Sequence, residues 1–235
     1  MPQTALITGA TEGIGRAIAF TLGRAGYRVG VCSRTAGRLA QLLEALRAEG
    51  ITASGQTADV GVEADVQAMV AHVTGDLGPV DVLVNNAGVG FLKPFSELSL
   101  AEWDRTMATN LRSLFLVTRE VLPAMRARGR GAIVNIASLA GKNAVLGGTA
   151  YAASKHAVLG FSKSLMLEVR KDGVRVVAIC PGSVETGFGS GRTVPKISRS
   201  GVLLPEDVAE VVLDTLRLPE RALMSEIDLR PANPA

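Results

Sequence analysis

Tyr151 and Lys155, in the segment YAASK, are two side chains whose chemistry and spacing suggest catalysis. Residues four apart share one face of a helix, so a helix here would place the Lys155 ammonium beside the Tyr151 phenol. A neighbouring positive charge lowers the pKa of a phenol because it favours the phenolate. A tyrosine tuned in this way can donate or accept a proton near neutral pH, which is general acid–base chemistry.

Ser138 could complete such a site. It ends the apolar run GAIVNIAS, which predicts a buried strand, at the edge of the sheet where the tyrosine helix would begin. A hydroxyl at this point could hold the carbonyl oxygen of a substrate. His156 follows Lys155 but points away from the shared helix face, and we interpret it as incidental.

The segment TGATEGIG places Gly9, Gly13 and Gly15 where an apolar strand turns into a helix. No G-K-[ST] follows, which excludes a nucleoside-triphosphate loop. A glycine turn at a helix N-terminus can bring backbone N–H groups against a pyrophosphate. The alternative is a tight, closely packed turn that binds no ligand, and this segment alone does not decide between the two.

Ser33 and Arg34 end the second predicted strand, about eighteen residues after Gly15, where a dinucleotide-binding sheet contacts the adenosine ribose. A carboxylate there would bind both ribose hydroxyls, whereas the planar fork of an arginine suits a phosphate. The pair therefore favours NADP(H). The alternative is a solvated arginine at a helix entry, and the charge of Glu12, which lies in the same phosphate region, opposes phosphate binding.

The elements that would position these residues alternate along the chain. Apolar, β-branched runs predict strands at 4–8, 28–32, 51–57, 80–85, 131–137, 174–180 and 224–229. Helical patterns lie between them at 13–25, 36–48, 63–75, 101–128, 151–171 and 205–218. Such alternation predicts parallel strands joined by right-handed crossovers. We expect a single-domain, doubly wound Rossmann fold over residues 1–235, with a mainly parallel seven-stranded sheet and helices on both faces.

The composition narrows the class of protein. Hydrophobic residues make up 47% and charged residues 20%, a soluble globular balance. We see neither a membrane span nor a signal peptide, and expect a cytoplasmic protein without a membrane partner. The basic patch RARGR at 126–130 lacks interleaved aromatic residues, so we expect no nucleic-acid partner. Cys32 and Cys180 lie in apolar runs as expected of reduced core residues, and the Cys and His spacings predict no metal site.

Taken together, the motifs resemble those of the classical short-chain dehydrogenases/reductases, in the same order and over nearly the whole chain. The matching pieces are TGATEGIG (8–15), DV (59–60), NNAG (85–88), Asn110, Ser138, YAASK (151–155) and PGSVET (181–186). The resemblance implies that Tyr151 is the general acid in carbonyl reduction and the base in alcohol oxidation. It also implies that Lys155 lowers the pKa of Tyr151 and holds the nicotinamide ribose, that Ser138 binds the substrate oxygen, and that Asn110 holds a water in a proton relay.

The same resemblance implies a set of cofactor contacts. The pyrophosphate site would be shaped by Gly9, Thr11, Gly13, Ile14 and Gly15. The adenine would meet Asp59 and Val60, and the adjoining ribose would be lined by Asn86, Ala87 and Gly88. The carboxamide end of the nicotinamide would be positioned by Pro181, Gly182, Val184 and Thr186. In that family Ser33 and Arg34 resemble the pattern that prefers NADPH over NADH.

The chain departs from the family in two segments. Residues 187–204 are shorter than the helical substrate lid of many relatives and rich in Gly and Ser, so we expect a mobile loop and a permissive pocket. Phe188 and Val194 are its expected pocket-facing residues. Its basic residues would either bind a phosphopantetheine or remain solvated; they are Arg192, Lys196 and Arg199. The ending at 225–235 lacks the glycine-rich sequence that usually helps to build an interface, so homodimer and homotetramer both stay open.

We predict an NADP-dependent oxidoreductase that transfers a hydride between NADP(H) and a carbonyl or alcohol substrate, such as a 3-oxoacyl thioester or another small ketone. One alternative is a catalytically silent NADP(H)-binding sensor or scaffold. A second is a sugar-nucleotide epimerase or dehydratase, but that group typically has a different glycine spacing and a larger C-terminal substrate region.

Overall fold

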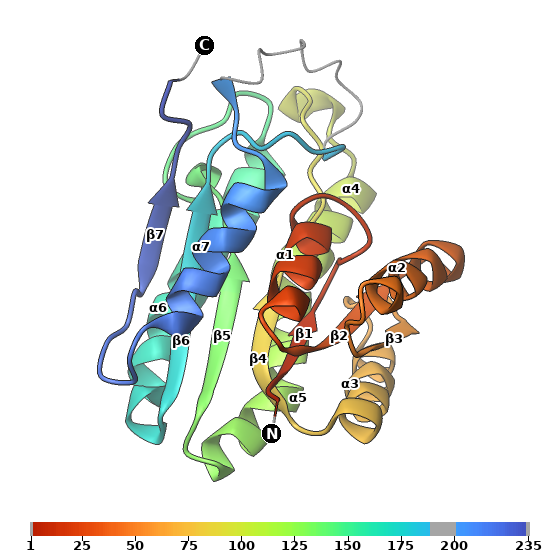
Figure 1. Ribbon diagram of the computed structural model, residues 1–235. Coiled ribbons are helices and arrows are strands. Elements are labelled where there is room, and N and C mark those ends of the chain that lie inside the picture. The colour runs from red at the N-terminus through yellow and green to blue at the C-terminus, as the bar shows by residue number, and fades with distance from the viewer. Residues whose placement is uncertain (1, 189–200, 234–235) are drawn as a thin grey trace.

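A seven-stranded sheet forms the centre of the computed structural model, which describes residues 2–188 and 201–233 (Figure 1). The strand order is β3-β2-β1-β4-β5-β6-β7, and every neighbouring pair is parallel. The strands are β1 (Thr4–Ile7), β2 (Arg28–Ser33), β3 (Ala53–Thr57), β4 (Val80–Asn85), β5 (Gly131–Ile136), β6 (Val174–Pro181) and β7 (Glu226–Leu229). The predicted fold class is therefore confirmed.

Helices cover both faces of this sheet (Figure 1). One apolar layer is built with α1 (Gly13–Arg24), α2 (Ala36–Ala48) and α7 (Pro205–Arg217). The other is built with α3 (Glu63–Leu77), α5 (Ser113–Ala127) and α6 (Thr149–Val169). No helix in the described part of the chain combines the length and the hydropathy that crossing a bilayer requires.

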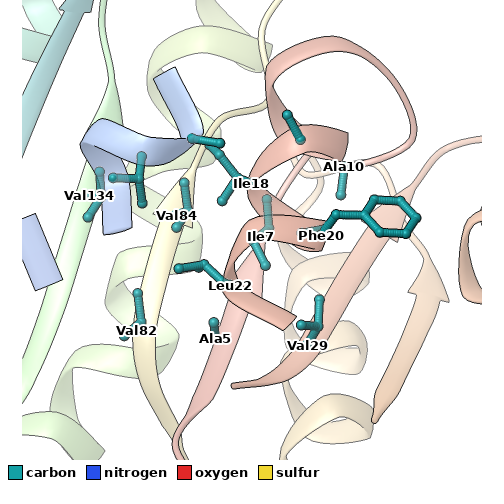
Figure 2. Packing of buried hydrophobic residues seen from close by; sticks show 14 of the residues in the cluster. Ala5, Ile7, Ala10, Ile18, Phe20, Leu22, Val29, Val82, Val84 and Val134 are labelled. Carbon is teal, nitrogen blue, oxygen red and sulfur yellow. The ribbon is translucent and has the colours of Figure 1, made fainter. Parts of the chain in front are cut away.

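Alternate residues of the central strands face opposite layers, which explains why their sequences are apolar throughout. Ile7 of β1 belongs to the layer of α1, whereas Leu6 belongs to the opposite layer. Figure 2 shows Ile18 and Leu22 of α1 beside Ile7 and Val84.

The two cysteines are buried and free as expected, and burial raises the pKa of both thiols to about 11.

The order in which the chain adds strands to the sheet reverses between β1 and β4. The chain builds β1, β2 and β3 outward on one side, then crosses to place β4 on the other side of β1. Loops that follow two such strands leave in opposite directions, and the crevice beyond their carboxyl ends is the usual ligand site of these sheets. The glycine segment follows β1, and residues 86–88 follow β4, so both border this crevice.

The helix predicted over 101–128 is interrupted. The structure has α4 (Leu100–Met107), a π-helical turn (Ala108–Arg112) and then α5. The helix begins at Leu100, one residue before the predicted start, and Ser99 and Glu102 form a reciprocal capping box there. A π turn holds one residue more per turn than an α-helix and is frequent at functional sites. Here it contains the buried Asn110.

Two buried asparagines join β4, β5 and α6. Asn85 and Asn135 are register partners, and Asn85 Nδ2 donates to Asn135 Oδ1 at 2.9 Å. Asn135 Nδ2 then donates to Ser162 Oγ at 2.9 Å, and Ser162 donates to the Val158 carbonyl at 2.7 Å. Every polar atom in this chain of bonds is removed from water, so each depends on its partner.

We expect Asn135→Ala to lower the free energy of unfolding by roughly 2–4 kcal/mol, because it leaves the Asn85 and Ser162 side chains short of a buried partner. Urea unfolding at pH 7 measures this. Asn143→Ala is the matched control, since Asn143 is exposed and bonds only to the Leu139 carbonyl among described residues. Equal losses in the two variants would contradict a special role for the buried amides.

Candidate active site

The glycine segment packs so closely on the loop after β4 that two of its positions have no room for a side chain. Gly9 has φ +64°, and a Cβ there would lie 2.8 Å from Ala87 Cα. A Cβ on Gly15 would lie 2.3 Å from the Gly9 carbonyl oxygen and 2.4 Å from Asn86 Nδ2. Backbone atoms cannot move aside at such distances. Packing alone therefore requires both glycines, whether or not a ligand binds.

Hydrogen bonds hold the same two loops together. Asn86 Nδ2 donates to the carbonyls of Thr8 (3.0 Å) and Gly9 (2.9 Å). The Thr8 hydroxyl accepts from the backbone N–H of Asn86 (3.0 Å) and of Ala87 (3.1 Å). Sequence reasoning missed Thr8, although it is the first residue of the TGATEGIG motif. Asn86, predicted to line a ribose, uses its amide to fix the glycine segment.

The N-terminus of α1 is suited to an anion. Glu12 precedes the helix but makes no side-chain cap, so the first N–H groups of α1 have no side-chain acceptor there. Gly13 has φ +53°, and a Cβ there would lie 3.0 Å from Thr186 Cγ2. The predicted pyrophosphate segment and the predicted nicotinamide segment are therefore neighbours, as one dinucleotide spanning the crevice would require. These residues fit such a cofactor.

The four predicted catalytic residues lie together. Ser138 follows β5, and its hydroxyl is close enough to Tyr151 to lower the pKa of the phenol. Lys155 Nζ is 5.8 Å from the centre of the Tyr151 ring. A Cβ on Gly88 would lie 3.5 Å from Asn110 Oδ1 and 3.9 Å from Lys155 Nζ, so Gly88 lies between these two side chains. The structure thus brings together residues that are far apart in the sequence.

Lys155 donates to the backbone rather than to the phenol. Its side chain is only 5% exposed and donates to the Ile136 carbonyl at 2.8 Å. Burial lowers the pKa of Lys155 to about 8 and raises the pKa of Tyr151, and the hydroxyl of Ser138 opposes only part of the rise for Tyr151. The pKa of Tyr151 is therefore raised overall by burial, opposite to the predicted direction, and the Lys155 ammonium bonds to Ile136 rather than to the phenol.

Asn110 is held by three hydrogen bonds in the π turn. Its Oδ1 accepts from Val89 N–H (2.8 Å), and its Nδ2 donates to the Val89 carbonyl and to Ser154 Oγ (both 2.9 Å). Ser154, which is fully buried, donates in turn to the Tyr151 carbonyl at 2.7 Å. Ser154 belongs to YAASK but was not predicted as functional. It connects the π turn to the first turns of α6.

The predicted adenosine contacts lie at the ends of β2 and β3. Ser33 Oγ accepts from Thr35 N–H (3.2 Å) and lies 3.5 Å from Thr11 Oγ1, while Arg34 is exposed. The Asp59 carboxylate accepts from Gly61 N–H at 2.9 Å, and Val60 is buried. Ile14 packs against the core layer of α1. The Arg34 guanidinium is thus available to a ligand, whereas the Asp59 carboxylate holds its own turn.

The predicted nicotinamide segment, residues 181–186, is hydrogen-bonded to the chain near Leu229 and near Leu203. Pro181 ends β6, and Gly182 N–H donates to the Leu229 carbonyl at 2.8 Å. Val184 pairs with Leu203, which brings together the two ends of the predicted loop at 187–204. The predicted mobility of that loop, together with Val194 and the candidate cations, falls on 189–200, outside the described residues.

The ring of Phe188 lies beside that of Tyr151. The two ring centres are 5.5 Å apart and the rings are tilted by 53°. A Cβ on Gly90 would lie 2.9 Å from Phe188 Cε1 and 3.2 Å from Tyr151 Cδ2, so Gly90 leaves space for this stacking. Phe188 was expected to face the pocket, and its contact with Tyr151 is consistent with that. Gly90 was missed, because a lone glycine in a loop carries no signal of its partner.

We expect Lys155→Met to abolish catalysis yet to raise the free energy of unfolding at pH 7 by up to about 3 kcal/mol, because burial of the ammonium opposes folding. The folded pKa is about 8 and the model-peptide value is 10.5. Below pH 8 both states keep the proton and the full cost remains. Between pH 8 and 10.5 the folded lysine loses its proton first, so the wild-type protein gains stability and the difference shrinks.

Urea unfolding from pH 6 to 10.5 measures this difference. Lys163→Met on the same helix is the control, since Lys163 is exposed and pairs with Glu226. A Lys155→Met variant that is no more stable than the wild type at pH 7 would contradict the cost of the buried charge.

Comparisons with known proteins agree with this geometry. The family model for short chain dehydrogenases matches residues 3–194. A Streptomyces coelicolor protein named "Putative ketoacyl reductase" is 48% identical over 186 residues, covering 78% of this chain and 71% of the relative. The sepiapterin reductase of Chlorobaculum tepidum is 35% identical over 99% of this chain and 98% of its own. A single-substitution variant of the actinorhodin polyketide ketoreductase, solved with NADPH, superposes with a TM-score of 0.90 at 39% identity, covering 98% of this chain and 96% of its own. This chain belongs to the short-chain dehydrogenase/reductase family.

Proposed function

We propose that this protein is an NADPH-dependent oxidoreductase that reduces a ketone to a secondary alcohol and can run in the opposite direction. The observation that supports it is the meeting of Ser138, Tyr151 and Lys155 beside the crevice lined by the glycine segment. The cofactor is supported by the relative solved with NADPH and by a metagenomic short-chain oxidoreductase solved with NADP, which has 37% identity and a TM-score of 0.86 over 98% of this chain and 97% of its own.

The protein's own groups would handle the proton and the orientation. When bound, NADPH supplies the hydride to the carbonyl carbon. Tyr151 donates its proton to the carbonyl oxygen, and Ser138 donates a hydrogen bond to the same oxygen. Burial raises the pKa of Tyr151, which keeps the phenol protonated at neutral pH and ready to act as the acid. Lys155 remains mostly charged below pH 8 and opposes the charge left on Tyr151.

Asn110 would take part in proton resupply through its backbone rather than its amide. The amide oxygen and both amide hydrogens are already bonded to Val89 and Ser154. A π turn leaves carbonyls out of the regular α-helical ladder. We therefore place the proposed relay water against a carbonyl of the turn, while the side chain of Asn110 keeps that turn in position.

The cofactor would extend along the crevice from β2 to β6. Its pyrophosphate would meet Gly9, Thr11, Gly13, Ile14 and Gly15. The adenosine half would meet Ser33, Arg34, Asp59 and Val60. The nicotinamide half would meet Asn86, Ala87, Gly88, Tyr151, Lys155, Pro181, Gly182, Val184 and Thr186. The uncapped start of α1 and the exposed guanidinium of Arg34 support the two phosphate positions.

Apolar side chains at the mouth favour a ketone with an apolar part. Lys93 N–H donates to the Gly147 carbonyl at 2.8 Å, which joins the two loops that follow β4 and β5. These loops expose Leu92, Phe95 and Leu146, with 40%, 71% and 97% of their surface accessible. Because several relatives are named ketoacyl reductases, a 3-oxoacyl thioester is the first substrate to test.

We further propose that residues 1–235 act as one cofactor-binding domain in the cytoplasm and assemble as a homodimer or homotetramer, which light scattering would distinguish. The central test is loss of NADPH absorbance with a panel of 3-oxoacyl thioesters, other ketones and aldehydes. Tight NADPH binding with no turnover of any carbonyl would favour the silent sensor instead.

We expect Tyr151→Phe to lower kcat by about 10²-fold or more, the usual scale of general acid–base catalysis. NADPH affinity, measured by fluorescence, should change little because the ring still fills its site. Tyr27→Phe is the matched control, since Tyr27 is the other of the two tyrosines and packs against the core layer of α1. Near-wild-type turnover in Tyr151→Phe would mean that another group delivers the proton.

We also expect a preference for NADPH that the combined change Ser33→Asp and Arg34→Ala reverses. The aspartate would accept hydrogen bonds from both ribose hydroxyls, and loss of the arginine removes a charge-assisted partner of the 2′-phosphate, worth roughly 1.5–3 kcal/mol. The kcat/KM values with NADPH and NADH measure this. Equal values for the two cofactors in the wild-type protein would refute the assignment.

A further inference from the structure

Glu12 and Arg38 form an ion pair across the mouth of the adenosine half of the crevice. Arg38 Nη1 lies 3.0 Å from Glu12 Oε2, and both side chains are largely exposed. Glu12 precedes α1, and Arg38 lies in the first turn of α2. The pair therefore links the glycine segment to the helix that follows Ser33 and Arg34.

The pair borders a hollow of about 280 Å³ beside the end of β2. Its lining consists of Thr11, Glu12, Arg16, Arg38, Gln41 and Leu42. Thr11 also lies 3.5 Å from Ser33, the residue expected to meet the adenosine ribose. The hollow therefore lies next to the expected position of that ribose. Two cations and one anion line it, so an incoming phosphate meets a net positive charge.

The position of Arg38 is unfavourable for the stability of helix α2. The first turn of α2 contains this cation and no acidic residue, although the positive end of a helix dipole favours anions. Arg16, the other cation of the hollow, already packs over the ring of Phe20 at 4.7 Å. Arg38 has Glu12 as its ion-pair partner in the described residues, and such exposed pairs are weak. A dianion could displace Glu12 at little cost.

We infer that Arg38 is a second ligand of the cofactor 2′-phosphate, and that Glu12 holds Arg38 in the free protein until the phosphate replaces it. This inference rests on the NADP(H) assignment proposed above and adds two residues to it. It also reverses the interpretation of Glu12 from the sequence, since its charge is not simply opposed to the phosphate. Glu12 competes with the phosphate for one arginine and thereby sets how strongly NADP(H) is preferred over NAD(H).

The test measures dissociation constants of NADP⁺ and NAD⁺ by titration calorimetry, without turnover. Arg38→Gln should weaken NADP⁺ binding about 10-fold and leave NAD⁺ within about 2-fold, the loss of one charge-assisted contact. Glu12→Gln should increase the preference for NADP⁺ about 3-fold, because Arg38 no longer has to leave a partner. An unchanged ratio of the two constants in Arg38→Gln would overturn the inference.

The double variant separates competition from plain repulsion. If Glu12 acts through Arg38, the effect of Glu12→Gln on the ratio disappears once residue 38 is already Gln. If Glu12 repels the phosphate directly, the effect persists in the Arg38→Gln background, and the competition is refuted. Arg24→Gln is the matched control, since Arg24 pairs with Glu49 at 2.8 Å between the far ends of α1 and α2 and should leave both constants unchanged.

Failure of this inference can be told apart from failure of the cofactor assignment. A wild-type protein that does not prefer NADP⁺ refutes the assignment, and the role of Arg38 with it. A wild-type preference that the Ser33→Asp and Arg34→Ala change reverses, but that Arg38→Gln leaves intact, refutes the role of Arg38 alone. Thermal unfolding of each variant confirms that a changed affinity does not reflect a misfolded helix α2.

Discussion

The close contact between the backbones of Gly9 and Ala87 is the constraint on which the rest of the site depends. It forms where the strand order reverses between β1 and β4, and it leaves no space for a Cβ on Gly9. The same contact sets the start of α1 on one side. On the other side the chain continues to Gly88, which lies beside Asn110 and Lys155. The crevice and the predicted catalytic side chains therefore share one floor, the backbone of Gly9 and residues 86–88.

Beside this floor lies a buried charge that opposes folding, the ammonium of Lys155. Lys155 is buried with a depressed pKa, and a single backbone carbonyl, that of Ile136, accepts from its ammonium in the described structure. The neighbouring Asn110 and Ser154 side chains are bonded to each other, because Asn110 Nδ2 donates to Ser154 Oγ. Stability is thus lowered at a residue whose charge the proposed proton transfer would use, and the neighbouring Asn110 and Ser154 side chains are hydrogen-bonded.

The sequence predicted the sheet and the location of the site because both follow from local patterns. Buried parallel strands are apolar throughout, and YAASK lies within one helix. The π turn at Asn110 could not be predicted, since the helical periodicity of 101–128 continues across it. The pKa of Tyr151 is raised rather than lowered because the phenol is buried, and the spacing of Tyr151 and Lys155 does not encode that burial. The pairing of Glu12 with Arg38 likewise depends on how two helices pack.

The rim of the site is exposed, whereas its floor consists of closely packed backbone. Leu92, Phe95 and Leu146 are exposed, and the ring of Phe188 contacts that of Tyr151 at a tilt of 53°. Substitutions there change the shape of the mouth without disturbing backbone contacts such as that of Gly9 with Ala87. Relatives with names as different as ketoacyl reductase and sepiapterin reductase align with this chain at 35–48% identity. Because one fold can host many functions, the differences among these relatives must lie in their sites rather than in the sheet that they share.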